Sequence, residues 1–179
     1  NFIISINYLG HMIENYFGDG SQLNVNIKYL REKKPLGTAG SLSLIKSLPK
    51  DTFIVINGDV ITDLSYSDFI NFHKSQKALA TMAVNAYEQQ NPFGVVKTKD
   101  LKIIELEEKP IVKSHINAGI YAFSPKILKH LKYNKNLNMT KFFLDLKKKK
   151  LKILAYALHE QWVDIGRKND FYKFKKNKK

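Results

Sequence analysis

The chain has 179 residues with 44% hydrophobic and 12% aromatic content, which indicates a globular domain with its own core and excludes a disordered chain. It contains no cysteine, which excludes disulfides and thiolate metal sites and fits a cytoplasmic protein. No apolar run reaches the roughly 20 residues of a membrane span. The net charge of +14 would suit nucleic acid, anionic lipid or a phosphorylated small substrate.

The first half of the chain alternates segments with strand and helix patterns. The run "TFIVINGD" is continuously apolar before its Gly-Asp end, which is typical of a central parallel strand, and "FIISIN" is expected to be a buried strand. In chain order we expect a strand at 2–7, a helix at 8–17, a strand at 25–30, a helix at 41–48, a strand at 52–59, a helix at 66–76 and a strand at 78–87. This order predicts an α/β fold with a largely parallel sheet.

The second half begins with a different pattern. The segments 93–98 and 102–110 flank "KDL", which predicts a hairpin or a strand pair, and a strand at 116–123 follows. A helix at 124–131 would have Ser124 as its N-cap and Pro125 at its first position. The remaining expected elements are a helix at 139–150, a strand at 151–158 and a helix at 169–177. No linker divides the chain, so we expect one domain over residues 1–179.

Much of the positive charge falls after residue 146, beginning with "KKKK" at 147–150. We interpret this run as the solvated end of a helix, where cations suit the helix dipole. No nucleic-acid-binding motif accompanies the charge, so nucleic acid is the least favoured partner.

Two aspartates follow strand-like segments. Asp59 ends "INGD", and in open α/β sheets ligands bind at the carboxyl ends of strands. Asp164 in "WVDIG" has a similar setting. If the two carboxylates met at one point they would suit Mg²⁺, which takes one or two carboxylates plus substrate phosphates. An ordinary turn aspartate explains Asp59 equally well.

Two further motifs carry polar groups at strand ends. Lys109 lies in "EEKP", where the following proline is expected to hold it extended, and it could meet a phosphate as a point charge or be a solvated strand end. Asn117 and Gly119 open "NAGIY", where a sugar hydroxyl or a β-bulge would explain them equally well. The five histidines show no ligand spacing and are interpreted as surface or packing residues.

The loop "REKKPLGTAGSL" places Gly37 and Gly40 close together between a strand and a helix. Turns rarely need two glycines at this spacing unless the backbone passes near another group.

Six motifs in this order resemble the successive motifs of the sugar-1-phosphate nucleotidyltransferase family. They are "EKKPLGTAGSL", "VINGDV", "NPFGVV", "LEEKP", "INAGIYAF" and "WVDIG", and they cover nearly the whole chain. The "PLGTAG" loop is similar to that of mannose-1-phosphate guanylyltransferases, although uridylyl and other members vary around the same loop. The resemblance implies a Rossmann-like, three-layer α/β fold with a mixed, mostly parallel sheet.

The resemblance also implies roles for individual residues. The glycine-rich loop would pass the nucleotide base, and Asp59 and Asp164 would bind Mg²⁺. With Lys109 at the sugar phosphate, these two aspartates make the catalytic set. The residues expected at the nucleotide are Pro35, Leu36, Gly37, Thr38, Gly40 and Gly58, and those expected at the sugar are Gly94, Glu108, Asn117 and Gly119.

One part of the family pattern is not found. The family signature is a glycine-rich "GGxGTR" loop after the first strand, which holds the triphosphate, and no such stretch occurs here. The chain therefore resembles an N-terminally truncated domain without the first strand and phosphate loop, and the chain as given is expected to be inactive. The family's first strand would lie between 2–7 and 52–59, so we expect an additional segment or a partner chain there, or the two strands paired with each other.

The expected function of the intact protein is transfer of a nucleotidyl group from an NTP, with GTP favoured, to a sugar 1-phosphate. The products are a nucleotide sugar and pyrophosphate. Two alternatives remain: a non-catalytic sugar-nucleotide-binding or regulatory subunit, and a nucleic-acid-binding protein. The expected partners are the two substrates, with no membrane, and a homo-oligomer is an open alternative.

Overall fold

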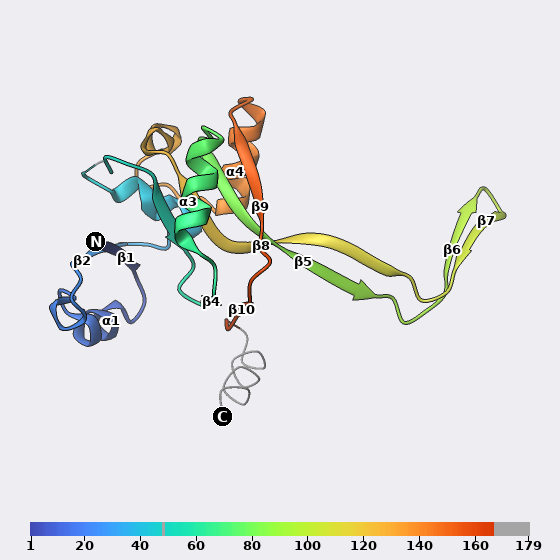
Figure 1. Ribbon diagram of the computed structural model, residues 1–179, viewed down its shortest axis with the longest axis horizontal. Coiled ribbons are helices and arrows are strands. Elements are labelled where there is room, and N and C mark those ends of the chain that lie inside the picture. The colour runs from blue at the N-terminus through green and yellow to red at the C-terminus, as the bar shows by residue number, and fades with distance from the viewer. Residues whose placement is uncertain (48, 167–179) are drawn as a thin grey trace. The chain divides into compact units, whose positions relative to one another are not determined.

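The computed structural model describes residues 1–47 and 49–166 (Figure 1). These residues form a mixed α/β fold with a mixed sheet, as the sequence predicts. The helix expected at 169–177 lies outside the described residues. Within the described part of the chain, no helix is long and apolar enough to cross a membrane.

The chain divides into two compact units, each assembled from three separate stretches of sequence. Unit 1 comprises Asn1–Phe53, His73–Ala80 and Phe123–Ile153. Unit 2 comprises Ile54–Phe72, Thr81–Ala122 and the described residues after Ile153. We describe each unit by itself.

Unit 1 begins with a two-stranded parallel sheet. The first elements of unit 1 are β1 (Phe2–Ile6), α1 (Gly10–Phe17), the 3₁₀ helix η1 (Ser21–Leu23) and β2 (Ile27–Arg31). The sheet consists of β1 and β2, with Phe2 opposite Ile27 at one end and Ile6 opposite Arg31 at the other. The expectation of a buried strand at 2–7 is wrong, because Phe2 is 56% and Ile3 48% exposed, and only Ile6 is buried. No described strand other than β2 pairs with β1, so one edge of β1 is left open.

The core of unit 1 is built on helical segments. These are α2 (Gly37–Gly40), η2 (Ser41–Leu44), η3 (Pro125–His130) and α4 (Met139–Lys148). The Phe123 ring lies 6.3 Å from that of Phe142 and 6.0 Å from that of Phe143. In α4 the apolar residues recur at helical spacing, so one side of the helix buries Phe142, Phe143 and Leu146.

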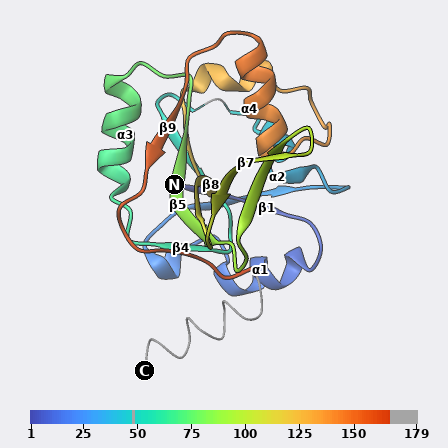
Figure 2. The ribbon, with the colours of Figure 1, turned by 90° about the vertical axis from the view of Figure 1, so that its right-hand side faces the viewer.

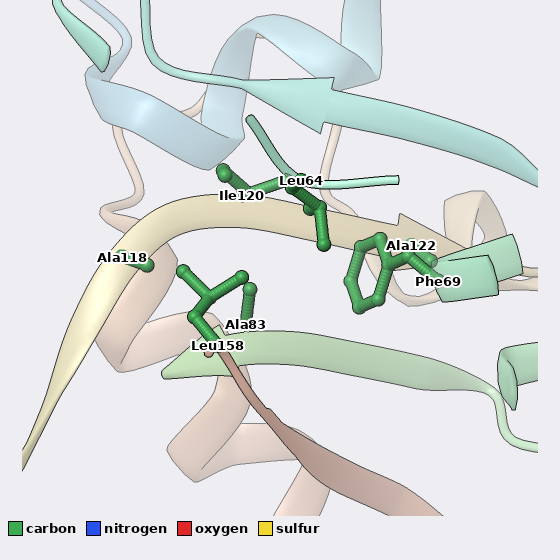
Figure 3. Close-up of a cluster of buried hydrophobic side chains, with 7 residues drawn as sticks. All are labelled: Leu64, Phe69, Ala83, Ala118, Ile120, Ala122 and Leu158. Atoms are coloured by element: carbon green, nitrogen blue, oxygen red, sulfur yellow. The ribbon is translucent and has the colours of Figure 1, made fainter. Parts of the chain in front are cut away.

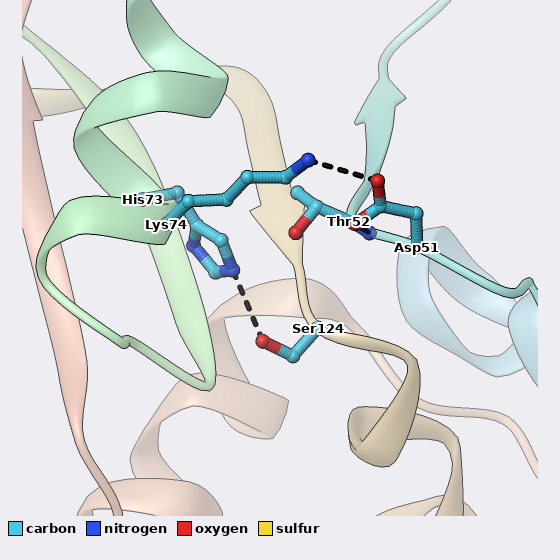
Figure 4. Close-up of polar contacts among 5 residues, drawn as sticks. All are labelled: Asp51, Thr52, His73, Lys74 and Ser124. Carbon is cyan, nitrogen blue, oxygen red and sulfur yellow. Dashed lines mark hydrogen bonds and ion pairs between the residues drawn. The ribbon is translucent and has the colours of Figure 1, made fainter.

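In unit 1, a hydrogen bond between His73 and Ser124 connects the end of α3 (Tyr66–Ser75) to the segment that contains Ser124 (Figure 4). His73 is 1% exposed, and its Nε2 lies 3.2 Å from Ser124 Oγ, whose hydroxyl donates to the Ala78 carbonyl at 2.8 Å. Ser124 occupies the predicted N-cap position but makes no side-chain cap, and its hydroxyl donates to the Ala78 carbonyl. Nearby, Lys74 Nζ and Asp51 Oδ2 form an ion pair at 2.8 Å.

The main sheet lies mostly in unit 2. It has the strand order β3 (Phe53–Ile56), β8 (Ile111–Phe123), β5 (Ala80–Gln90), β9 (Ile153–Ala157). The expectation that 52–59 is a central strand is wrong among the described residues, because β3 is at the end of this order and pairs only with β8. An apolar run indicates that the faces of a strand are covered, and it carries no information on the number of neighbouring strands. β1 and β3 do not pair with each other.

The core of unit 2 lies between this sheet and α3 (Figure 3). Figure 2 shows α3 beside β9, and the ring centroids of Phe69 and Tyr156 are 5.1 Å apart. The buried cluster consists of Leu64, Phe69, Ala83, Ala118, Ile120, Ala122 and Leu158. Its small residues come mainly from the central strands, which lets the larger side chains of α3 and the connecting segments approach.

Two short antiparallel pairs complete unit 2. The predicted hairpin is present as β6 (Val95–Lys99) and β7 (Lys102–Glu107), with an irregular register between Lys97 and Thr98. Figure 1 shows this hairpin at the far end of the ribbon formed by β5 and β8. The second pair is β4 (Val60–Thr62) with β10 (Trp162–Asp164).

Candidate functional site

The pairing of β4 with β10 brings the two predicted metal ligands together. Asp164 lies opposite Val60, and the Ile165 N–H donates to the Asp59 carbonyl at 2.8 Å. Asp164 Oδ1 accepts a hydrogen bond from the Gly166 N–H at 2.8 Å. A Cβ built on Gly166 would lie 2.6 Å from Asp59 Oδ2 and 3.0 Å from Asp164 Oδ1. Both carboxylates therefore face one point that the glycine leaves free.

The chemistry of this pair fits a small divalent cation. Both aspartates are exposed, so a cation held between them would also be open to a substrate. Mg²⁺ is usually held by one or two carboxylates, with substrate phosphate and water completing its coordination. Within residues 1–47 and 49–166, no three or more His, Cys, Asp or Glu side chains are grouped so that they could hold a metal ion by themselves. Asp59 and Asp164 thus provide a donor set that suits a metal shared with a substrate.

The segment before Asp59 is held against β8. The Asn57 N–H donates to the Gly119 carbonyl at 2.9 Å, and Trp162 Nε1 donates to the Ala118 carbonyl at 2.8 Å. Gly119 has a φ of +72°, and a Cβ there would lie 2.9 Å from Asn57 Nδ2. Both facts require glycine at this position. In the sequence, the only signal of Asn57 is its place in "INGD".

Asn117 uses its amide within its own strand. Its Nδ2 donates to Tyr121 Oη at 2.8 Å, and its Oδ1 accepts from the Gly119 N–H at 3.0 Å. Burial raises the pKa of the Tyr121 hydroxyl, although the hydrogen bond from Asn117 partly opposes this rise. The bond to Gly119 gives Asn117 a structural role at the irregular point of β8, and its predicted contact with a sugar remains a prediction.

The other predicted sugar-site residues gather at the base of the β6–β7 hairpin. A Cβ on Gly94 would lie 3.0 Å from Glu108 Oε2, so these two residues are adjacent. Lys109 has a φ of +48°, and the expectation that it is extended is wrong. The short bend that joins β7 to β8 imposes this left-handed backbone, which is uncommon for a lysine. Such strain is found preferentially at functional sites.

The glycine-rich loop of unit 1 passes another segment of the chain. Gly37 has a φ of +73°, and a Cβ there would lie 2.6 Å from Asn138 Oδ1 and 2.8 Å from the Leu137 carbonyl oxygen. A Cβ on Gly40 would clash with the Lys135 carbonyl oxygen. The glycines therefore allow residues 135–138 to pack against the loop, whereas the resemblance explained them by a nucleotide base.

Hydrogen bonds join the same two segments. The Leu137 carbonyl accepts from the N–H groups of Ala39 and Gly40 at 2.9 and 3.0 Å. Thr38 Oγ1 accepts from the Met139 N–H at 2.8 Å, at the start of α4. Asn136 Nδ2 donates to the Pro35 carbonyl at 3.0 Å. Thr38 therefore has a structural partner that no local pattern indicates, because the partner is 101 residues away.

The remaining predicted nucleotide residues differ in their surroundings. Leu36 is fully buried, and its carbonyl accepts from the Leu137 N–H at 2.8 Å. Gly58 is exposed, with no atom within 4 Å of a Cβ built on it. It precedes Asp59 and belongs to unit 2, whereas residues 35–40 belong to unit 1. The nucleotide and sugar roles of all these residues remain predictions.

The chain matches known proteins over its whole length. The profile of the family described as "Nucleotidyl transferase" matches residues 1–179. The chain is 32% identical over 176 residues to the mannose-1-phosphate guanylyltransferase catalytic subunit beta of Dictyostelium discoideum. That alignment covers 94% of this chain and 49% of the relative, so the chain spans about half the length of this relative.

Two solved structures have a similar fold. One is a putative glucose-1-phosphate thymidylyltransferase from Bacillus anthracis in complex with a sucrose, with a TM-score of 0.70, 25% identity, and coverage of 96% of this chain and 73% of that one. The other is HddC from Yersinia pseudotuberculosis complexed with GMP-PN, with a TM-score of 0.68, 26% identity, and coverage of 99% and 78%.

Proposed function

Because the chain belongs to the nucleotidyl transferase family, we propose that the protein carrying it transfers a nucleotidyl group from an NTP to a sugar 1-phosphate. The products would be a nucleotide sugar and pyrophosphate. We further propose that residues 1–179 are part of one nucleotidyltransferase domain.

The observation that carries this proposal is the meeting of Asp59 and Asp164 at Gly166. Two carboxylates at one point would repel each other unless a cation lay between them. These two residues would hold Mg²⁺, which would supply neutralisation of phosphate charge. The exposed position of both side chains would leave the cation accessible to a substrate phosphate.

The proposed reaction needs no protein nucleophile. An oxygen of the sugar 1-phosphate attacks the α-phosphorus of the NTP, and the bond to the departing pyrophosphate breaks. The protein contributes position and charge. Lys109 would donate to the sugar phosphate as a point charge, and Glu108 and Gly94 beside it would contact the sugar.

We favour GTP as the nucleotide. The supports are the "PLGTAG" loop and the name of the guanylyltransferase relative. The similarity to a protein named as a thymidylyltransferase keeps the pyrimidine nucleotides as alternatives. The expected cytoplasmic location, a homo-oligomeric state and the absence of nucleic-acid binding remain predictions from the sequence.

The test is pyrophosphate release by the natural full-length protein. Each of GTP, UTP, dTTP and CTP is combined with mannose 1-phosphate or glucose 1-phosphate in the presence of Mg²⁺. Asp59→Asn and Asp164→Asn should each lower turnover by at least about a hundredfold, because each removes a charge that holds the cation. The matched control is Asp63→Asn, an exposed carboxylate four residues beyond Asp59.

The outcomes separate the alternatives. Turnover that Asp59→Asn and Asp164→Asn abolish, and that Asp63→Asn retains, supports the proposal. Nucleotide-sugar binding without turnover would instead support a non-catalytic subunit. Full activity in Asp59→Asn would contradict the proposed site.

A further inference from the structure

Asp164 lies on a very short pair of strands, and Asp59 directly precedes the other strand of that pair. β4 and β10 each have three residues, with Thr62 opposite Trp162 at one end and Val60 opposite Asp164 at the other. Among the described residues the two strands form a sheet of their own. An isolated two-stranded pair is marginally stable in water, and a slip of one residue would turn Asp164 to the opposite face. The position of Asp164 therefore depends on contacts outside the pair.

Trp162 makes such a contact with β8. Its Nε1 donates to the Ala118 carbonyl at 2.8 Å, and its ring packs against the buried cluster of unit 2. Side chains two residues apart on a strand project from the same face, so Trp162 and Asp164 share one face of β10. Holding the indole against β8 thereby fixes the face from which the Asp164 carboxylate extends.

The other carboxylate is held in a matching way at the next residue of β8. The Asn57 N–H donates to the Gly119 carbonyl at 2.9 Å, and Asp59 follows Asn57 by two residues. Asp164 likewise follows Trp162 by two residues. Two adjacent residues of β8 thus accept the hydrogen bonds that hold both carboxylate-bearing segments. One of these bonds comes from the backbone, whereas the other comes from a side chain and can be removed by substitution.

The neighbouring hydrogen bonds join β10 to the segment that contains β4. The Gln161 carbonyl accepts from the Asp63 N–H at 3.1 Å and from Thr62 Oγ1 at 3.0 Å. The Ile165 N–H donates to the Asp59 carbonyl at 2.8 Å. Bonds along one edge of a strand leave it able to rotate about that edge. The indole contact with β8 opposes this rotation, because it holds the face of the strand.

We infer that Trp162 is a positioning residue for the candidate metal site, and that its indole N–H holds Asp164 at the separation from Asp59 that a cation requires. This inference rests on the proposed function. Mg²⁺ demands near-ideal geometry from its oxygen ligands, so a displaced carboxylate binds it less well. Trp162 touches neither the cation nor a substrate in this account and acts through β10.

The experiment measures the affinity of the natural full-length protein for Mn²⁺, with free Mn²⁺ detected by electron paramagnetic resonance. Mn²⁺ suits the same carboxylate and water ligands as Mg²⁺. Trp162→Phe keeps an aromatic ring and removes the N–H donor, so we expect the affinity to fall about tenfold, as for other groups that orient metal ligands. Asp164→Asn, which changes a ligand itself, should cause the larger loss and sets the scale.

The matched control is Tyr156→Leu. Like Trp162, Tyr156 is a half-buried aromatic residue packed against the buried cluster of unit 2, and its ring lies 5.1 Å from that of Phe69. It lies on β9 and outside the β4–β10 pair. Its loss should lower the melting temperature and leave the Mn²⁺ affinity at the wild-type value. This separates a general loss of stability from a change in the position of Asp164.

A wild-type Mn²⁺ affinity in Trp162→Phe would overturn the inference, as would an equal loss of affinity in Tyr156→Leu. If Trp162→Phe does not fold, benzothienylalanine incorporated at position 162 decides, because it keeps the shape of the indole without its N–H. A wild-type affinity there would also overturn the inference. Mn²⁺ binding that neither Asp59→Asn nor Asp164→Asn weakens would overturn the proposed function instead, so the two failures are distinct.

Discussion

Gly37 and Gly58 both belong to the predicted nucleotide site, but their surroundings differ. A side chain at Gly37 would meet Asn138 and Leu137 and would require a φ of +73°, whereas nothing lies within 4 Å of a Cβ at Gly58. We therefore expect Gly37→Ala to lower the free energy of unfolding by about 1–3 kcal/mol, and Gly58→Ala to change it by less than about 0.5 kcal/mol. Urea denaturation of the two variants checks this. If the two variants lose the same free energy of unfolding, residues 135–138 can move to accommodate a side chain at position 37. The structural role assigned to Gly37 would then be wrong.

This difference matters for tests of nucleotide binding. A larger residue at position 37 would disturb the contacts that hold the loop, so any loss of binding would combine a folding effect with a direct one. Gly58 offers the cleaner test, because its replacement leaves the described contacts intact.

His73 gives the stability a dependence on pH. Its burial, with a smaller contribution from the positive charge of Lys74, lowers its pKa below the usual 6.5. The unfolded state then binds a proton more readily than the folded state, so the contribution of His73 is complete above the unfolded pKa of about 6.5. It should be lost as the pH falls from there through the lowered folded pKa.

The measurement compares urea midpoints at pH 7.5 and pH 5 for the wild type and His73→Gln. We expect the wild type to lose more stability between these values than the variant does. His159→Gln, which removes an exposed histidine, is the control and should behave as the wild type. If the wild type and His73→Gln lose the same amount, protonation of His73 is not coupled to unfolding.

At the scale of secondary-structure elements, the sequence predicts best what local patterns determine. The helix expected at 66–76 is α3, and the one at 139–150 is α4 within two residues, because apolar residues at helical spacing mark one face. The β6–β7 hairpin follows from two apolar segments joined by a short polar turn.

Features that depend on distant segments were predicted poorly. The apolar residues of β1 suggested burial, yet burial requires a neighbour, and only β2 pairs with this strand among the described residues. The apolar run of β3 likewise suggests a central strand, but β3 pairs only with β8 among the described residues. Hydropathy indicates which side chains would be stabilised by burial. Which of them are buried depends on the packing of segments that are distant in the sequence.

The candidate site shows the same division. Asp59 and Asp164 were expected to meet because each ends a strand in a matching motif, and the register of β4 with β10 brings them together. The support of residues 35–40 by residues 135–139 had no local signal, since about a hundred residues separate the two segments.

On the scale of the whole molecule, the two units share continuous elements of secondary structure. Every boundary between them falls inside a strand or helix: Phe53 and Ile54 are both in β3, His73 follows Phe72 within α3, and the others fall in β5, β8 and β9. These units differ from domains joined by a linker. If one unit unfolded, the strands and helices that it shares with the other unit would lose part of their length.

We therefore expect the 179-residue chain to unfold in one cooperative transition. Trp162, its only tryptophan, reports on unit 2, whereas far-UV circular dichroism also reports on α4 in unit 1. Their urea curves should coincide, and the calorimetric and van't Hoff enthalpies should agree. The control is Phe142→Ala, which weakens the core of unit 1 by about 3–5 kcal/mol without changing residues of unit 2 and should move both curves together. A fluorescence curve that stays in place while the dichroism curve shifts would show that the units unfold independently.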